Sequence, residues 1–254
     1  AERVRAYPAR KRLEGMTRCL LAMIDEDGAV FSSYREAQKR KKVAVEPLYY
    51  PGEVALALAK IYETTEDESA LEGARRIADR QLRLYALPLL AQFPWSGDHW
   101  MIQALASLAA TTGKNAYAEL ALLMARGYLR EQYPPQAFLY PDYRGAYRRI
   151  FDVPRTTRAA SRGEALGGAL RAADILGEDA TPFERSLIEG ARHLAEQEYT
   201  RDNSTFVPAS MDVLGGIRMG LVDDHLRIDN NQHGLVAMLN GIRAHDRLKA
   251  KGGF

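Results

Sequence analysis

One stretch near the start of the chain sets a pattern that later parts repeat. Residues 51–65 open with the polar Glu53, then carry apolar residues on nearly every side, and end in a short polar turn. In residues 68–84 the apolar residues share one face: Leu71, Ala74, Ile77, Ala78 and Leu82. A helix that is apolar all round is buried, and one with a single apolar stripe lies at the surface. The pair therefore predicts an inner helix followed by an outer helix.

This unit recurs along the chain. The later inner segments are residues 98–113, 162–177 and 229–239, and the outer segments that follow the first two are 115–130 and 181–199. The last inner segment has no outer partner after it, and the amphipathic residues 9–24 could fill that place. We therefore predict an all-α fold, an (α/α) toroid of about four helical hairpins, as a single domain over residues 1–254.

Short insertions interrupt the helical pattern. Residues 29–35 alternate well enough for a short strand, and Gly215-Gly216 predicts a small β-hairpin between residues 205–207 and 216–219. The tyrosine- and proline-rich residues 133–149 are typical of a lid, a cleft wall or a packed surface loop. Thr181, followed by proline and by glutamate at position 184, predicts a capped helix start.

Charge and cysteine content narrow the classes of partner. Lys+Arg number 35 and Asp+Glu 33, so the formal net charge of +2 gives no reason to expect a nucleic-acid partner. The basic run at residues 39–42 is expected to be a solvated loop. Cys19 is the one cysteine and stands in an apolar run, which predicts a buried thiol and no disulfide within the chain.

No targeting signal fixes the compartment, which stays open. The sequence has no signal-peptide pattern and no apolar run near the roughly 20 residues that span a bilayer, so no membrane span is predicted. The chain begins at Ala1 rather than methionine, which is typical of a processed protein or of a piece of a longer one. Other domains of a larger protein are therefore expected partners alongside any ligand.

The predicted chemistry lies where the starts of the inner helices converge on one mouth. Aligning the repeats places Glu164 on Glu53 and His233 on Glu164, with Asp229 close by. We predict these four residues as catalytic. The alternative is that each glutamate only caps its own helix, because helix N-termini favour carboxylates. Capping does not, however, call for histidine, tryptophan and arginine at equivalent positions.

Two kinds of sugar chemistry suit these groups. A pair of carboxylates with separated pKa values is the apparatus of glycoside hydrolysis. Histidine or tyrosine beside an arginine instead suits proton abstraction next to a uronate carboxylate, which is lyase or epimerase chemistry. The predicted substrate-binding residues are Arg35, Tyr49, Tyr50, Asp98, His99, Trp100, Tyr143, Arg162 and Gln232. No phosphate-binding loop, dinucleotide fingerprint or metal-ligand spacing is present, so neither a cofactor nor a metal is predicted.

Two stretches of the sequence resemble a known superfamily. Residues 51–67 (PGEVALALAKIYETTED) and 98–105 (DHWMIQAL) look like the (α/α)-toroid and six-hairpin glycosidase superfamily. Residues 227–233 (RIDNNQH), followed by an apolar helix, are distantly similar to the helical domain of glucuronyl C5-epimerases. The resemblance covers about residues 51–245 and implies a carbohydrate-active enzyme with its substrate at the mouth of the toroid. Most members have six hairpins, whereas four are predicted here.

Two functions from different classes follow. The favoured one is a carbohydrate-active enzyme, a glycoside hydrolase or a uronate lyase or epimerase, acting on an oligosaccharide or polysaccharide. The alternative is a non-catalytic helical toroid that binds glycan or peptide or docks onto other domains. The sugar, the linkage and the bond chemistry stay open at this point.

Overall fold

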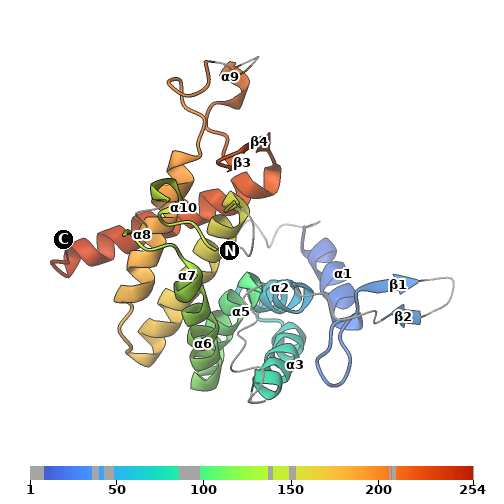
Figure 1. The fold of residues 1–254 in the computed structure, drawn as a ribbon. Helices are drawn as coiled ribbons and strands as arrows, with labels where there is room; N and C mark the ends of the chain where they lie inside the picture. Colours follow the sequence, from blue (N-terminus) through green and yellow to red (C-terminus); the bar gives the residue numbers. More distant parts are fainter. Residues whose placement is uncertain are drawn as a thin grey trace. The chain divides into compact units, whose positions relative to one another are not determined.

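The chain is mostly helical, which confirms the prediction of an all-α fold (Figure 1). A computed structural model describes residues 9–35, 40–42, 49–85, 98–136, 140–148, 153–205, 207 and 210–253. These form two compact units, residues 1–124 and 125–254, whose boundary lies inside helix α6 (Asn115–Glu131). The closed toroid and the single domain concern how the two units are joined, so both stay predictions.

The first unit contains the first two predicted helical hairpins. Its elements are α1 (Ala9–Ala22), β1 (Ser33–Arg35), β2 (Arg40–Lys42), α2 (Tyr50–Thr65), α3 (Glu68–Tyr85), α5 (His99–Thr112) and the first part of α6. Helix α2 packs against both α3 and α5. Pro51 lies in the first turn of α2, where its missing N–H costs no hydrogen bond. The predicted helices 51–65 and 68–84 are confirmed to within one residue.

Helix α5 shows why a segment apolar on all sides becomes an inner helix. The consecutive residues Leu105, Ala106, Ser107 and Leu108 point to all sides of the axis, and all four are buried. Helix α3 has the opposite character, because it buries Leu71, Ala74, Ile77 and Ala78 and exposes charged residues elsewhere. The contrast between inner and outer helices is therefore confirmed for these two elements.

Two predictions about the first unit are wrong. Residues 40–42 of the basic run form β2 rather than a loop, because they pair antiparallel with β1, Arg40 lying opposite Arg35. Cys19 is exposed rather than buried. On α1, Thr17 is buried while Met16 and Cys19 are exposed, so this helix has a narrower buried face than its apolar residues suggest.

The second unit is built around α10, which packs against both α7 and α8. Its elements are the 3₁₀ helix η3 (Pro141–Tyr143), α7 (Thr156–Leu176), α8 (Thr181–Glu196), α9 (Ser210–Val213), β3 (Arg218–Gly220), β4 (Asp223–Leu226) and α10 (Ile228–Ala250). A Cβ placed on Gly163 would lie 2.4 Å from the Cβ of Ala237. One on Gly167 would lie 2.3 Å from Nδ2 of Asn240. These two glycines therefore let α7 and α10 approach closely, because a side chain at either position would collide with α10.

The small hairpin of the second unit pairs different strands from those predicted. Strand β3 pairs antiparallel with β4. Thr205 and Val207 belong to no strand, and Phe206 lies outside the described residues. The position beside Gly216 is taken by Tyr199, whose N–H donates to the Gly216 carbonyl at 2.9 Å while the Gly215 N–H donates back to Tyr199 at 2.9 Å. The start of α8 also differs from the prediction that Thr181 caps it. The carboxylate of Asp179 is the acceptor there, and it accepts the N–H of Thr181.

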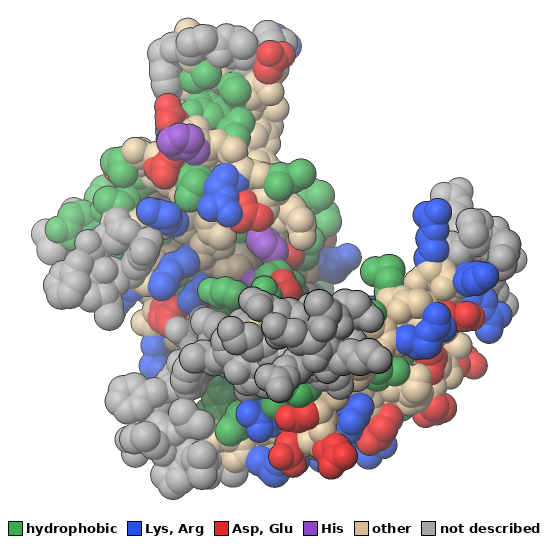
Figure 2. Space-filling view, turned by 90° about the vertical axis from the view of Figure 1, so that its right-hand side faces the viewer, with side chains coloured by type: hydrophobic (Ala, Val, Ile, Leu, Met, Phe, Trp, Pro, Cys, Tyr) green, Lys and Arg blue, Asp and Glu red, His purple; other side chains and the backbone are tan. Residues whose placement is uncertain are grey.

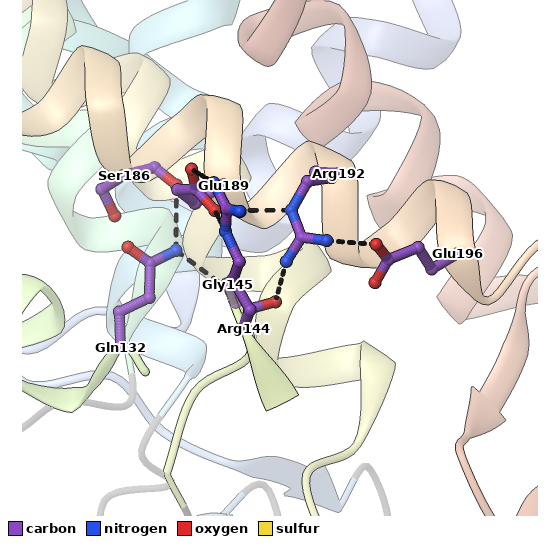
Figure 3. A network of polar contacts seen from close by, with 7 residues as sticks. All are labelled: Gln132, Arg144, Gly145, Ser186, Glu189, Arg192 and Glu196. Atoms are coloured by element: carbon purple, nitrogen blue, oxygen red, sulfur yellow. Dashed lines mark hydrogen bonds and ion pairs between the residues drawn. The ribbon is translucent and has the colours of Figure 1, made fainter. Parts of the chain in front are cut away.

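The segment before α7 is tied to α8 by a network of polar contacts (Figure 3). Arg144 makes two hydrogen bonds of 2.6 Å to Glu189, and Arg192 donates to the Arg144 carbonyl at 3.0 Å. Gln132 donates to the carbonyls of Gly145 and Ser186. Burial alone would raise the pKa of Glu189, but the contacts with Arg144 and Arg192 together lower it. These contacts therefore hold residues 140–148 against α8.

The surface carries charges of both signs. On the face shown in Figure 2, basic and acidic side chains are interspersed with hydrophobic ones, as expected from the formal net charge of +2. Among the described residues, no helix is both long enough and apolar enough to cross a lipid bilayer.

Candidate functional site

Two predicted catalytic residues of the second unit are in direct contact. Nδ1 of His233 on α10 lies 2.9 Å from Oε2 of Glu164 on α7, and both side chains are buried. The close approach of α7 and α10 at Gly163 allows these short-range contacts. Asn240 strengthens the same junction by donating to the Gly163 carbonyl at 3.1 Å. The repeat alignment that placed His233 level with Glu164 thus identified two residues that touch.

The pair does not lie at helix starts, contrary to the prediction. Helix α7 begins at Thr156, six residues before the expected start at Arg162, so Glu164 lies in its third turn. Helix α10 begins at Ile228, and His233 lies in its second turn. Glu164 is too far from the free N–H groups of the first turn to cap its own helix. The capping alternative is therefore wrong for Glu164.

Arg162 is part of a separate buried cluster in the second unit. Its guanidinium donates to Oε2 of Glu131 at 3.1 Å and lies over the rings of Tyr128 and Tyr147, 4.8 and 5.8 Å from their centroids. Burial raises the pKa of Tyr147 to about 12. A substrate carboxylate would have to share this arginine with Glu131, so the anion-binding role of Arg162 stays a prediction.

The other predicted residues of the last helix are more exposed. Asp229 is half-buried and receives two hydrogen bonds from Arg227, at 2.9 and 2.7 Å. Gln232 is exposed. Between them, Asn230 is fully buried and accepts a hydrogen bond from Thr157 on α7. Asn230 therefore joins the start of α10 to α7, a role that the sequence pattern did not reveal.

In the first unit, Asp98 connects two helices. It is the N-cap of α5, and its carboxylate accepts the N–H of Met101 at 2.9 Å and the N–H of Gly52 on α2 at 3.0 Å. Burial raises the pKa of Asp98 to about 7, the two hydrogen bonds oppose that shift, and the charge of Glu53 adds to it. Glu53 itself is exposed. The geometry gives Asp98 a structural role, whereas Glu53 remains a surface carboxylate nearby.

Three predicted substrate-binding residues form an aromatic cluster in the first unit. The rings of His99 and Trp100 have centroids 3.8 Å apart, and Tyr49 meets them edge-on at 6.3 and 5.9 Å. Tyr49 and Tyr50 are exposed. Exposed aromatic faces of this kind can stack on sugar rings, and the prediction for this group remains open to test.

Two further predicted binding residues lie elsewhere in their units. Tyr143, in η3 of the second unit, stacks on the exposed ring of Tyr140 with 5.0 Å between centroids and also meets Tyr133 edge-on at 5.3 Å. Arg35 is the last residue of β1 in the first unit. The other tryptophan of the chain, Trp95, lies outside the described residues.

The second unit also has a cleft that the sequence analysis missed. Its volume is about 330 Å³, and its walls are residues 153–155 on one side and β3–β4 on the other. Polar groups of both signs line it: Arg155, Asp223, Asp224 and His225. Nδ1 of the exposed His225 lies 2.7 Å from Asp223, which raises the pKa of His225 and lowers that of Asp223. The run of two aspartates and a histidine was the available signal, but it was too short to interpret alone.

The carboxylates and the imidazole of this cleft could also be considered as metal ligands. The ligand atoms of Asp223, Asp224 and His225 all lie within 4.8 Å of one another. Solvent-exposed acidic groups commonly come this close with no ion between them, and nothing else in the cleft points to a metal.

Comparison of the chain with protein-family models, curated proteins and solved structures found no match. The functional argument therefore depends on the residues themselves, and the likeness to toroidal carbohydrate-active enzymes stays a prediction.

Proposed function

We propose that the chain is a carbohydrate-active enzyme of the uronate lyase or epimerase type, with its residues arranged in a helical toroid. The observation that carries the proposal is the buried contact of 2.9 Å between His233 and Glu164. A carboxylate that holds Nδ1 of an imidazole fixes its orientation and tautomer and stabilises the imidazolium that forms when Nε2 takes up a proton. The pair is thus suited to act as a general base.

This geometry favours proton abstraction over glycoside hydrolysis. Hydrolysis by the common mechanism needs two carboxyl groups on either side of the glycosidic bond. Here Glu164 contacts a histidine, and the carboxylate of Asp229 is occupied by Arg227. An imidazole base instead matches removal of the weakly acidic proton beside a uronate carboxylate.

In the proposed reaction, His233 removes the proton from C5 of the uronate. The electron pair of the C5–H bond moves into the carboxylate and forms an enolate. A water molecule on the opposite face donates a proton to C5, which gives the C5 epimer, and the hydroxide that remains takes up the proton of the imidazolium. Expulsion of the oxygen at C4, with its bonding pair, instead gives a C4–C5 double bond, and the imidazolium protonates the leaving oxygen. Arg35 and Arg162 are the arginines predicted to bind the uronate carboxylate.

Proton exchange at C5 tests both outcomes in one experiment. The purified chain is incubated in D₂O with a panel of uronate-containing polysaccharides, and NMR follows deuterium at C5 and any C4–C5 double bond. We expect exchange on at least one polymer, and a loss on the order of 100-fold or more in His233→Asn, the usual range for a general base. Glu164→Gln keeps an acceptor for Nδ1 but loses the charge, so a smaller loss is expected.

Matched controls separate catalysis from stability. Asp246→Asn changes an exposed acid elsewhere on α10 and should exchange at the wild-type rate. If Glu164→Gln and His233→Asn lower the melting temperature and no polymer exchanges, the pair is a structural contact. The chain is then better described as a non-catalytic helical domain.

A further inference from the structure

Helix α10 (Figure 1) has a second apolar face, opposite the one that packs against α7 and α8. Ile228, Leu235, Leu239 and Ile242 are 88, 60, 46 and 59% exposed, and we call these four residues the α10 stripe. The geometry of an α-helix places them within an arc of about 60° around the axis, whereas the buried Ala237 lies on the opposite side. Single exposed leucines are ordinary on a monomer, but four large apolar side chains in one stripe mark an interaction surface.

The α10 stripe follows the spacing of a coiled-coil seam. Positions 228, 232, 235, 239, 242, 246 and 249 are alternately four and three residues apart, like the a and d positions of a heptad repeat. Leucine or isoleucine occupies the middle three positions, and Gln232 and Asp246 border them. Such a seam packs against a second helix that lies along it at a shallow angle. The partner that fits the stripe is therefore another helix.

A second copy of α10 fits this requirement, because the seam matches itself when the two copies run antiparallel. With Ala237 at the centre of the contact, Leu235 of each copy faces Leu239 of the other. In the next layers outward, Ile242 of each copy covers Gln232 of the other. The apolar layers thus fall at the centre of the contact, and the layers that include a polar residue fall toward its ends, where water reaches them. A stable interface has this arrangement of an apolar core and a polar rim.

The charges beside the seam favour the antiparallel direction. Asp229 and Arg243 lie on the same flank, two heptads apart, so antiparallel copies bring Asp229 of each beside Arg243 of the other at both ends of the contact. A parallel pair would instead place Arg243 beside Met238 of the other copy. Arg227 already donates to Asp229, but a carboxylate accepts further donors. Arg243 is exposed, and its contact with Asn240 is long, at 3.5 Å.

We propose that the α10 stripe is the interface of a symmetric dimer of this chain, with the two copies of α10 antiparallel and Asp229 of each paired with Arg243 of the other. Such a two-fold contact uses the same surface on both copies and therefore closes at two chains. It runs over residues 228–246, about 19 positions per copy, just below the roughly 20–30 residues a side of a standard interface. We therefore expect a dissociation constant on the order of 10 µM. His233 lies on the buried side of α10, so the dimer does not rest on the proposed function.

Sedimentation equilibrium of the whole chain, from about 1 to about 500 µM, tests the dimer. Wild type should shift from monomer to dimer across this range. Leu239→Asp places a carboxylate in both central layers, so it should weaken association on the order of 100-fold or more. Leu123→Asp on α6 is the matched control, because Leu123 is an exposed leucine outside the stripe, and it should leave the dissociation constant unchanged. Circular dichroism melts check that both variants are folded.

Two charge variants test the direction of the helices. Asp229→Lys and Arg243→Glu each bring like charges together at both ends of the contact, so each alone should associate about 10-fold more weakly than wild type. In an equimolar mixture, one copy of each variant restores an opposite-charge pair at both ends. The mixture should therefore form a heterodimer with nearly the wild-type dissociation constant, and native mass spectrometry identifies it by mass.

Three results would overturn the proposal. A chain that stays monomeric at every concentration overturns it, and the stripe is then left for another segment or domain of the same polypeptide. A dimer that Leu239→Asp does not weaken uses another surface and overturns it as well. If the mixed charge variants associate no better than either variant alone, the antiparallel contact is overturned. Absence of C5 exchange in a chain that dimerises as expected counts only against the proposed function.

Discussion

Each of the two units buries acidic side chains at contacts between helices, but the groups that donate hydrogen bonds to those carboxylates differ between the units. In the first unit, Asp98 is 7% exposed and accepts backbone N–H groups from two helices. In the second unit, Glu184 is fully buried and accepts from Arg247 and Lys251, while Glu164 contacts His233. A backbone N–H offers only a partial charge, whereas a cationic side chain offers a full one. We therefore expect the stability of the two units to depend on pH in different ways.

The second unit also buries a histidine, and its protonation is expected to change stability with pH in the opposite direction to the ionisation of Asp98. His193 on α8 is fully buried, and burial lowers its pKa to about 4, with the charge of Arg192 contributing. A carbonyl contact with Asp142 offsets only part of this shift. The first unit therefore holds an acid that resists ionising, and the second holds a base that resists protonation. The two units should lose stability at opposite ends of the pH range.

The largest effect is expected in the first unit on raising the pH. The folded pKa of Asp98, about 7, lies above the ordinary value of 3.8, so the folded state holds a proton that the unfolded state has lost. Its contribution is complete below pH 3.8 and is lost as the pH rises to 7, a change of about 4 kcal/mol in the free energy of unfolding. Both tryptophans lie in residues 1–124, so denaturant melts followed by tryptophan fluorescence report this unit.

Asp98→Asn is the matched variant, since it cannot ionise. The difference in unfolding free energy between wild type and Asp98→Asn should change steadily between pH 4 and pH 7. A constant difference across this window would mean that Asp98 ionises normally in the folded chain.

The next effect is expected in the second unit and has the opposite sign. The folded pKa of His193, about 4, lies below its ordinary value of 6.5, so the unfolded state binds the extra proton between these pH values. Stability is complete above pH 6.5 and falls by about 3 kcal/mol as the pH drops to 4. Hydrogen exchange of α8, measured by mass spectrometry from pH 4 to 7 with correction for intrinsic rates, follows the loss. His193→Leu should remove the pH dependence, and an unchanged dependence would refute the assignment.

A smaller effect concerns packing in the second unit. Gly163→Ala would place a methyl group 2.4 Å from the Cβ of Ala237, so α7 and α10 must move apart. We expect a loss of about 2 kcal/mol, as for other overpacked cores. Gly190→Ala on α8 is the control, because its new Cβ would meet its nearest heavy atom, on Gln132, at 3.7 Å. It should be neutral or stabilise by up to about 1 kcal/mol. Equal melting temperatures for both variants would contradict the close approach.

The sequence predicted the helices well because their patterns are local. The all-round apolar run of α5 and the one-sided pattern of α3 each follow from spacing along a single segment. Pairings between distant segments were less predictable: β3 pairs with β4, and Gly215 and Gly216 pair with Tyr199. Such pairings depend on tertiary contacts, which the local pattern does not contain.

In the candidate site, too, some features could be predicted from the sequence and others could not. The contact between Glu164 and His233 followed from aligning repeats, because equivalent positions on neighbouring inner helices face each other. The start of α7 was missed by six residues because residues 156–161 (TTRAAS) contain no apolar run of the kind that marks the other predicted inner helices. The cleft beside Arg155 was missed because it needs the β3–β4 pairing to bring Asp224 to the opposite wall.

The smallest effect tests whether charge pairs of the second unit act alone or as a network. Arg144 is bound through two nitrogens to Glu189 and its carbonyl is held by Arg192, whereas Arg126 makes a single exposed contact with Glu178. Exposed single pairs contribute well under 1 kcal/mol, and networks with two-point geometry contribute more. Arg144→Gln should therefore cost about 1 kcal/mol and speed hydrogen exchange in residues 140–148, while Arg126→Gln should change neither. Equal, negligible effects would show that residues 140–148 are held in place by packing rather than by the network of charge pairs.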